Sequence, residues 1–264
     1  MEALSARGVT GPKEAEAGDS RPRLFGLPVD PLTLDQTVER CRRLIESGMP
    51  AQHAALNAGK VILTQDDARL ARIVRRCALV SADGMSIVWA GRLLGIPVPQ
   101  RVPGIDLMGR LLALAEERGW PVYFLGARPE ALEGFVAEVR RRHPRLVIAG
   151  RRHGYFDDDR AVAREIAASG ARLLFVGVSS PRKERFLAEQ LERMGPVFAM
   201  GVGGSFDVWA GRTRRAPAWM QRSGLEWLCR LIQEPRRMWR RYIVGNLRFA
   251  WLLIRSRLRP QRAV

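Results

Sequence analysis

A chain of 264 residues with 47% hydrophobic side chains is long enough to bury a sizeable core, which excludes disorder over most of its length. The formal net charge of +17 implies an anionic partner: nucleic acid, acidic lipid or a phosphorylated substrate. The longest apolar run near the end, residues 249–254, is far too short to span a bilayer, which takes about 20 residues.

The first part of the chain contains one polar segment and then regular elements. Residues 1–21 lack a hydrophobic period and the apolar stretch of a signal peptide, and we expect them to form a disordered arm. A capping box at Thr33–Gln36 predicts a helix that ends near Gly48. A strand is predicted at 54–57, one helix through 61–76, and a buried strand at 78–84 that ends on an acid and a glycine.

The middle of the chain alternates short apolar runs with amphipathic ones. Helices are predicted at 85–94, 105–118, 130–143, 160–170 and 181–194, and strands at 121–126, 146–150, 172–178 and 197–201. This alternation predicts an α/β fold: a Rossmann-like, mostly parallel sheet with helices on both faces. We expect a core over 22–203 and a helical, basic C-terminal appendage over 204–264.

Polar and small residues follow several of the predicted strands, where ligands bind in parallel sheets. These residues are Asn57, Asp83, Gly126, Ser179–Ser180 and Gly203–Asp207. A carboxylate at the position of Asp83 is able to accept a proton from a hydroxyl, although aspartate there also suits a helix N-cap. In the same way, GVSSPRKE at 177–184 either caps a helix or supplies hydroxyl, amide and Lys183 contacts to a sugar or phosphate.

The C-terminal part is the most polarised segment, with eleven arginines against two acids from residue 222 to 264. Arg230, Arg237 and Arg240 are spaced by seven and three residues, which predicts that one helical face carries all three. A solvated basic face explains this pattern, but Trp227 and Trp239 beside it favour an interface with a membrane or docking on the core.

Cysteine and histidine give no sign of a metal site. The three cysteines are scattered without CxxC spacing, which fits a reduced cytosolic protein. The three histidines form no ligand pattern. We therefore expect neither a metal nor a cofactor.

At this point the motifs resemble those of the WecG/TagA/CpsF family of bacterial glycosyltransferases, typified by N-acetylmannosaminyltransferases. The resemblance runs from about residue 24 to 247. It rests on Asn57, ADG at 82–84, RVPGIDL at 101–107, SSPRKE at 179–184, GVGGSFDVWAG at 201–211, RRAP at 214–217 and GLEWLCRLIQEPRRMWRRY at 224–242. It implies an inverting, metal-independent enzyme that moves a sugar from UDP to an undecaprenyl-diphosphate-linked sugar in cell-surface polysaccharide synthesis.

The resemblance also assigns roles to strand-end residues. Asp83 matches the proposed general base of the family. Asn57 matches a polar residue near the donor sugar, and Arg101 matches a site arginine. Asp207 and the glycines before it, including Gly203, match the segment that holds the nucleotide.

Arg230, Arg237 and Arg240 match appendage arginines that reach the active site of the family. The leaving UDP gains negative charge, and Arg237 is our first choice for neutralising it. Two positions depart from the family pattern: Ala55 stands where threonine is common, and Lys183 stands where glutamine is usual. A cation in place of an amide adds a charged hydrogen bond, which suggests a donor sugar other than plain N-acetylmannosamine, a uronate or a plain hexose.

The expected partners are a UDP-sugar donor, a polyprenyl-diphosphate-linked acceptor and an anionic membrane surface that the appendage contacts. The expected location is the cytoplasm, on the inner face of the plasma membrane. The sequence leaves homo-oligomer formation open. The charge alone also suggests a non-enzymatic nucleic-acid-binding protein, but acids in the cleft would repel a phosphate backbone. The missing GxGxxG disfavours a nucleotide-dependent oxidoreductase.

Overall fold

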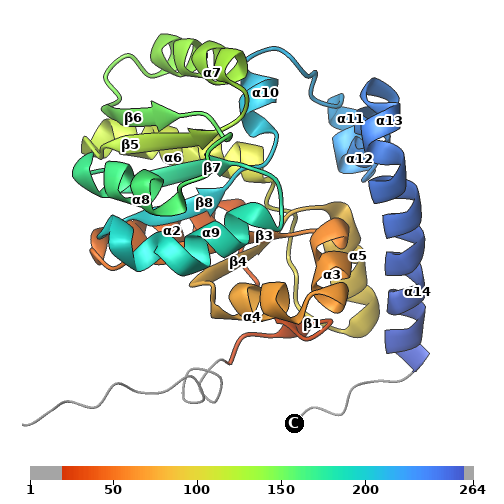
Figure 1. Cartoon of the computed structure of the whole chain (residues 1–264). Coiled ribbons are helices and arrows are strands. Elements are labelled where there is room, and N and C mark those ends of the chain that lie inside the picture. The colour runs from red at the N-terminus through yellow and green to blue at the C-terminus, as the bar shows by residue number, and fades with distance from the viewer. Residues whose placement is uncertain (1–19, 259–264) are drawn as a thin grey trace, which may run out of the picture.

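A central sheet of six parallel strands organises the molecule. The computed structural model describes residues 20–258, apart from the side chains of Arg237 and Arg241, so almost all of the proposed N-terminal arm lies outside the described residues. The strand order is β4-β3-β8-β7-β5-β6 (Figure 1). The bounds are β3 Ala51–Leu56, β4 Leu79–Ala82, β5 Val122–Gly126, β6 Ile148–Arg152, β7 Leu173–Gly177 and β8 Phe198–Gly201. A short antiparallel hairpin, β1 (Arg23–Leu24) with β2 (Leu27–Pro28), precedes them.

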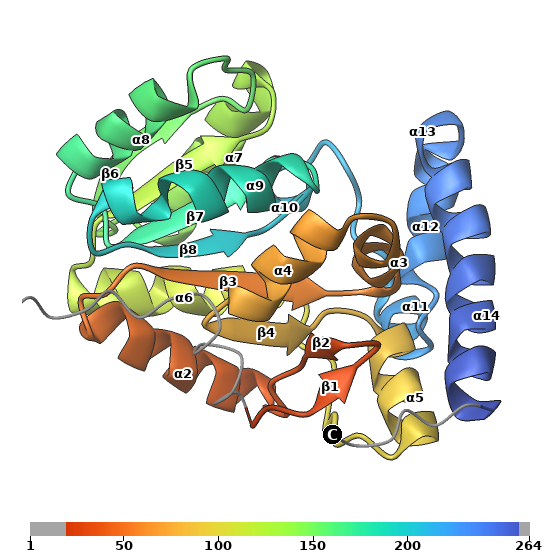
Figure 2. The same ribbon diagram turned by 60° about the horizontal axis from the view of Figure 1, so that its bottom comes forward.

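Helices cover both faces of the sheet, as Figure 2 shows. The first face carries α2 (Leu34–Glu46), α6 (Gly104–Arg118), α7 (Pro129–Arg142) and α10 (Ser205–Trp209) around a core that includes Phe124, Phe135, Phe175 and Phe206. The second face carries α3 (Ala58–Asp66), α4 (Ala68–Arg76), α5 (Met85–Leu94), α8 (Asp159–Ala168), α9 (Arg182–Gln190) and the short helix η1 (Leu191–Met194). The α/β fold class predicted from the sequence is confirmed.

The prediction of one helix through residues 61–76 is wrong, because the helix is interrupted at Asp67 and two helices, α3 and α4, are formed. Asp67 has extended backbone angles, and its Oδ1 accepts a hydrogen bond from the N–H of Leu70 at 2.9 Å. Aspartate competes in this way for backbone donors, so it ends α3 and begins α4. The hydrophobic period continues across the break, which hides it in the sequence.

The C-terminal helical segment consists of α11 (Ala218–Arg222), α12 (Glu226–Gln233), α13 (Pro235–Trp239), a π-helical turn η2 (Arg240–Val244) and α14 (Gly245–Leu258). It stands along one side of the sheet (Figures 1 and 2). The buried Phe249 of α14 packs edge-on against Phe25 of the β1–β2 hairpin, with ring centroids 5.4 Å apart. Arg248 pairs with Asp66 of α3 through two hydrogen bonds of 2.6 and 2.8 Å.

The prediction that one helical face carries Arg230, Arg237 and Arg240 is wrong. Glu234 leaves the helical conformation, and Pro235 follows it, so α12 ends before α13 begins. The residue before a proline is disfavoured in the α region, which explains the break. Arg230 therefore lies on a different helix from the other two.

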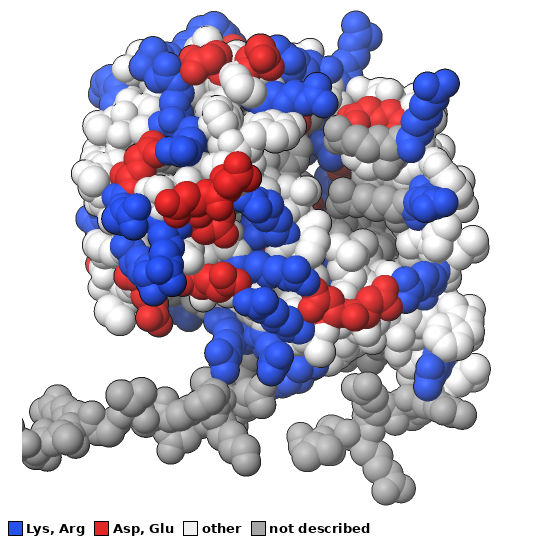
Figure 3. Space-filling view, in the orientation of Figure 1, with Lys and Arg blue, Asp and Glu red and all other residues white. Residues whose placement is uncertain are grey.

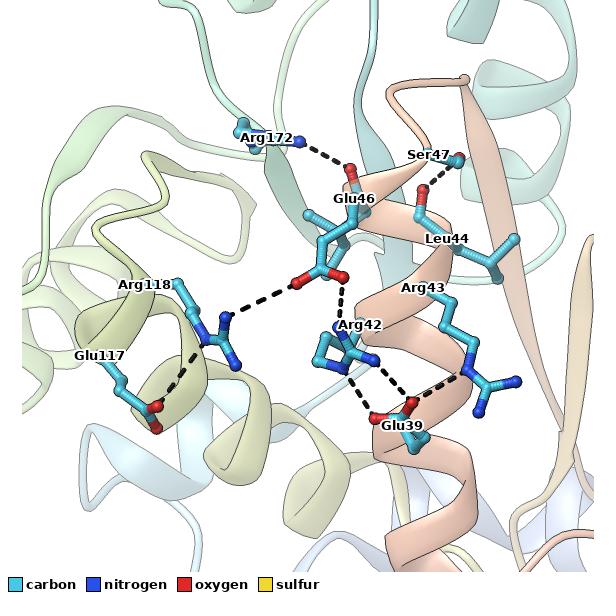
Figure 4. Close-up of polar contacts among 10 residues, drawn as sticks. Glu39, Arg42, Arg43, Leu44, Glu46, Ser47, Glu117, Arg118 and Arg172 are labelled. Carbon is cyan, nitrogen blue, oxygen red and sulfur yellow. Dashed lines mark hydrogen bonds and ion pairs between the residues drawn. The ribbon is translucent and has the colours of Figure 1, made fainter.

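Many arginines of the α/β body bind neighbouring acids. At the amino-terminal edge of the sheet, Arg172 donates to the Ile45 carbonyl at 2.9 Å, and Arg42 pairs with Glu39 at 2.7 Å and also with Glu46 (Figure 4). Basic and acidic side chains are interspersed over the body, whereas along α14 basic side chains lie among uncharged ones (Figure 3). Within residues 20–258, no helix is long and apolar enough to cross a membrane.

Candidate active site

The carboxyl ends of β3 and β4 bring Asn57 and Asp83 together. The two strands pair in parallel, and the N–H of Asp83 donates to the Leu56 carbonyl at 2.7 Å. The Oδ1 of Asn57 accepts the N–H of Lys60 at 3.0 Å and thereby caps α3. Gly84 follows with φ +137°, a conformation that side chains disfavour, and turns the chain into α5 beside Asn57.

Asp83 is half-buried, and its surroundings raise the pKa of its carboxyl above the ordinary value. Burial is the largest cause, and the negative charge of Glu226 adds to it. The charges of Arg101 and Lys60 and the backbone N–H of Gly104 act in the opposite direction. The carboxyl of Asp83 therefore holds a proton more strongly than an exposed aspartate does.

Two ion pairs surround this carboxyl. Arg101 lies just before α6 and donates to Glu226, the first residue of α12, at 2.7 Å. Arg215 binds Asp106 of α6 through two hydrogen bonds of 2.6 and 2.7 Å. The charges of Glu226 and Asp83 also act on Arg215 and raise the pKa of its guanidinium after the main effect of Asp106. The C-terminal helical segment therefore contributes charged groups to the strand-end site.

A second polar cluster lies beside the first and is formed by residues that follow β3 and β7 in the chain. Lys60 and Glu184, 6% and 2% exposed, form an ion pair at 2.7 Å. The Ser180 hydroxyl donates to Glu184 at 2.9 Å, and the ammonium of Lys183 donates to that hydroxyl oxygen at 2.7 Å. Burial favours a protonated Glu184, but the charges of both lysines and hydrogen bonds from Lys60 and Ser180 outweigh it and lower the pKa to about 2.

Glycines at the end of β8 and in the turn after it let two cationic side chains approach the backbone. A Cβ at Gly201 would lie 2.6 Å from the Cε of Lys183, and a Cβ at Gly204 would lie 2.7 Å from a guanidinium nitrogen of Arg230. Gly203 between them adopts φ +56°, the left-handed region that favours glycine. The turn thus brings Lys183 and Arg230 together at the end of β8, a neighbourhood that the sequence did not predict.

Three predicted site residues are not brought into these clusters: two have other neighbours, and the side chain of the third is not described. Asp207 is half-buried on α10, where its charge acts on Arg128, the residue before α7, which is hydrogen-bonded to Tyr155. Arg240 is exposed, with its guanidinium carbon 5.3 Å from the centre of the Trp239 ring. Arg237 lies in α13, but its side chain is outside the described part of the structure.

The sequence reasoning gave no role to Glu226, Lys60 or Glu184. Glu226 belongs to the GLEW motif at 224–227, and only the folded chain brings it to Arg101. A signal for Lys60 existed: it is one of three lysines in a chain that otherwise uses arginine.

The arrangement suits proton transfer next to a phosphorylated ligand. A carboxyl with raised proton affinity accepts a proton from a hydroxyl, and the guanidinium groups of Arg101, Arg215 and Arg230 suit anionic oxygens. Among residues 20–258, no three His, Cys, Asp or Glu side chains gather as a metal-binding group.

Comparison with known proteins agrees with this chemistry. Residues 22–263 match the model of the family described as "Glycosyl transferase WecG/TagA/CpsF family". A protein from Bacillus spizizenii is 35% identical over 175 residues, which cover 66% of this chain and 68% of the relative. A protein from Bacillus subtilis is 34% identical over 161 residues, which cover 61% of this chain and 62% of the relative, less than two thirds of its length. Both relatives are named N-acetylglucosaminyldiphosphoundecaprenol N-acetyl-beta-D-mannosaminyltransferase.

The buried pair of Lys60 with Glu184 yields a stability prediction. Replacing Lys60 by methionine leaves the Glu184 carboxylate with less compensation, and removing one partner of a buried pair costs about 3–5 kcal/mol. We expect a loss near the lower end of that range, because Lys183 remains 3.4 Å from Glu184. Urea unfolding at pH 7 measures it. The matched control is Arg110→Met, which breaks the exposed pair with Asp35 and should change stability by less than about 1 kcal/mol. Equal losses in the two variants would contradict a buried pair.

Proposed function

The chain belongs to the WecG/TagA/CpsF family of glycosyl transferases, and from that membership we propose that it transfers a sugar, with inversion, from a UDP-sugar to a polyprenyl-diphosphate-linked sugar. The transferred sugar is N-acetylmannosamine-like, or a related hexose or uronate. The names of the two relatives support this substrate class, since they specify an undecaprenol-linked N-acetylglucosaminyl diphosphate and an N-acetylmannosaminyl group. The product serves cell-surface polysaccharide synthesis.

The observation that carries the proposal is the half-buried Asp83 at the carboxyl edge of the sheet, on which the charges of the Arg101–Glu226 pair act. In the proposed reaction the acceptor hydroxyl attacks the anomeric carbon, and its proton passes to the Asp83 carboxylate. The bond from the anomeric carbon to the UDP oxygen breaks as the new bond forms, and UDP leaves with the electron pair. A base placed within hydrogen-bond reach accelerates such a step by about 10²–10⁴-fold.

The negative charge that develops on UDP calls for nearby cations. We assign donor and acceptor binding to Asn57, Arg101, Lys183, Gly203, Asp207, Arg230 and Arg240, and neutralisation of the leaving group to Arg237. Arg230 has the strongest geometric support among the C-terminal arginines, because it packs against Gly204 in the turn after β8. The functional appendage extends over 204–264 in this proposal, although the burial of Phe206 in the core favours a structural boundary after α10.

We further propose that the C-terminal helical segment lies on the anionic inner face of the plasma membrane, where a prenyl-linked acceptor is found. The support is an exposed apolar stripe at helical spacing: Val244, Leu247, Trp251, Ile254 and Leu258. Arginines of the same helix border it, among them Arg255, whose guanidinium lies 5.3 Å from the centre of the Trp251 ring. The opposite face of α14 packs on the core through Phe249, Leu252 and Leu253.

Replacement of the base tests the mechanism. We expect Asp83→Asn to lower turnover by about 10²–10⁴-fold, and Arg237→Ala to lower it as well, while Asp35→Asn at an exposed site leaves it unchanged. Ionising Asp83 is less favourable in the folded state than in the unfolded state, because its pKa is raised by folding. The protonated carboxyl therefore contributes stability that is present below the ordinary pKa of aspartate and is lost as the pH rises through the raised pKa. The asparagine variant therefore should unfold at the same or a higher temperature at pH 7. Wild-type turnover in either site variant would rule out its assigned role.

A donor panel tests the substrate class. The enzyme is incubated with several UDP-sugars and a prenyl-diphosphate-linked N-acetylglucosamine analogue, and the products are identified by mass. Because the buried ammonium of Lys183 adds a charged donor where the family has an amide, we expect a preference for a donor other than UDP-N-acetylmannosamine, and Lys183→Gln should shift that preference. If the wild type and Lys183→Gln used UDP-N-acetylmannosamine equally well, Lys183 would not select the donor sugar. If no donor gave a product, the proposed glycosyl transfer would be contradicted.

Vesicle flotation tests the membrane contact. Acidic lipids attract basic residues by about 1 kcal/mol for each Lys or Arg near the surface, so we expect binding to phosphatidylglycerol vesicles that weakens with salt. Trp251→Ser should reduce binding, whereas Met49→Ser, at an exposed residue before β3, should not. Equal binding by the two variants would place the contact elsewhere, and a gel shift with DNA at the same salt would favour the nucleic-acid-binding alternative.

A further inference from the structure

We infer that Glu226 is a positioning residue for the transfer reaction: by docking on Arg101 it makes Asp83 a stronger base when the C-terminal helices cover the carboxyl edge of the sheet. The inference rests on the proposed role of Asp83 as general base. Glu226 does not itself touch the reacting atoms in this role.

The position of Glu226 is set by packing between distant parts of the chain. Its carboxylate lies 2.7 Å from a guanidinium nitrogen of Arg101, 125 residues away in the sequence. Arg101 is 14% exposed and Glu226 is 35% exposed, so the pair is partly shielded from water. Glu226 opens α12, which belongs to the C-terminal helical segment, so its distance from Asp83 depends on how that segment docks.

The groups that face Asp83 come from several elements, and all but Glu226 favour the ionised carboxylate. They are the Lys60 ammonium on α3, the Arg101 guanidinium before α6, the N–H of Gly104 at the start of α6 and the Arg215 guanidinium before α11. Burial raises the pKa of Asp83 against the effect of these groups, and the charge of Glu226 acts in the same direction as burial. The negative charge of Glu226 opposes these positive charges directly. Through its ion pair it also weakens the effect of the Arg101 charge on Asp83.

The position of Glu226 affects how strongly the Asp83 carboxylate acts as a base. A general base works best when its pKa lies near the working pH, and burial and like charges are the means by which proteins raise the pKa of a carboxylate. Burial raises the pKa of the Asp83 carboxyl, and Glu226 at the start of α12 adds the like charge. The charge reaches Asp83 because the pair with Arg101 holds Glu226 at the carboxyl edge of the sheet.

Two variants of the same ion pair separate this role from simple attachment of the helices. Glu226→Gln removes the negative charge, so the Asp83 carboxyl should titrate at lower pH than in the wild type. Arg101→Gln removes the positive charge instead, while the Arg215–Asp106 pair still attaches the C-terminal helices to α6, so the carboxyl should titrate at higher pH. If the pair served only to attach α12, both variants would shift the titration in the same direction.

The titration is followed in the full-length chain by ¹³C NMR of labelled aspartate side chains, with Asp83 identified by the signal that Asp83→Asn removes. Glu226→Asp should return the titration toward the wild-type position and provides a second variant if Glu226→Gln folds poorly. Glu192→Gln, at an exposed acid on η1, controls for net charge and should leave the titration unchanged. An unchanged titration in Glu226→Gln, or an equal shift in Glu192→Gln, would overturn the inference.

The pH dependence of kcat/KM distinguishes this inference from the proposed function. In Glu226→Gln the acid limb should move to lower pH together with the carboxyl titration. If the titration moves while the acid limb stays in place, Glu226 does control the Asp83 carboxyl, but Asp83 is not the base and that part of the proposed function fails.

Discussion

The geometry of the candidate site depends on the parallel pairing of β3 with β4, whose last hydrogen bond joins the N–H of Asp83 to the carbonyl of Leu56 at 2.7 Å. Both strands end at the same edge of the sheet, so the chain delivers Asn57 and Asp83 side by side. The following turns differ: Asn57 caps α3, whereas Gly84 takes up a conformation that leaves Asp83 beside the start of α6. The remaining charged groups are arranged around this fixed pair.

Charged side chains in a partly buried site need neighbouring charges of opposite sign. In this protein, ion pairs between elements that are distant in the sequence provide them. Lys60 with Glu184 joins α3 to α9, Arg215 with Asp106 joins the chain before α11 to α6, and Arg101 with Glu226 joins the chain before α6 to α12. Such pairs add little net stability, because desolvation offsets their attraction, but they define where each charge sits. The last two pairs also attach the C-terminal helices at the edge of the sheet, and charges from all three pairs lie around Asp83.

The large arginine content serves different purposes in different parts of the molecule. On the body, arginines such as Arg42 and Arg141 bind acids of their own helices at or near the surface. In the C-terminal segment acids are scarce, and arginines accompany exposed apolar side chains, as Arg255 accompanies Trp251. The helix α14 is thus apolar on two faces, one against the core and one toward solvent, which is the feature that supports a surface partner.

The sequence by itself determined the alternation of strands and helices, the capping box at Thr33 and the strand-end positions of Asn57 and Asp83, because these follow from local periodicity and turn chemistry. It also carried the motifs that identify the family. It did not reveal the break at Asp67, since the hydrophobic period runs through it. The separation of Arg230 from Arg237 and Arg240 did have a signal in the sequence, Pro235, which the helical spacing of the arginines does not take into account. The ion pairs made by Glu226, Lys60 and Glu184 were decided only by the tertiary structure, because the proton affinity of a buried carboxyl depends on charges that lie far away in the chain and close in space.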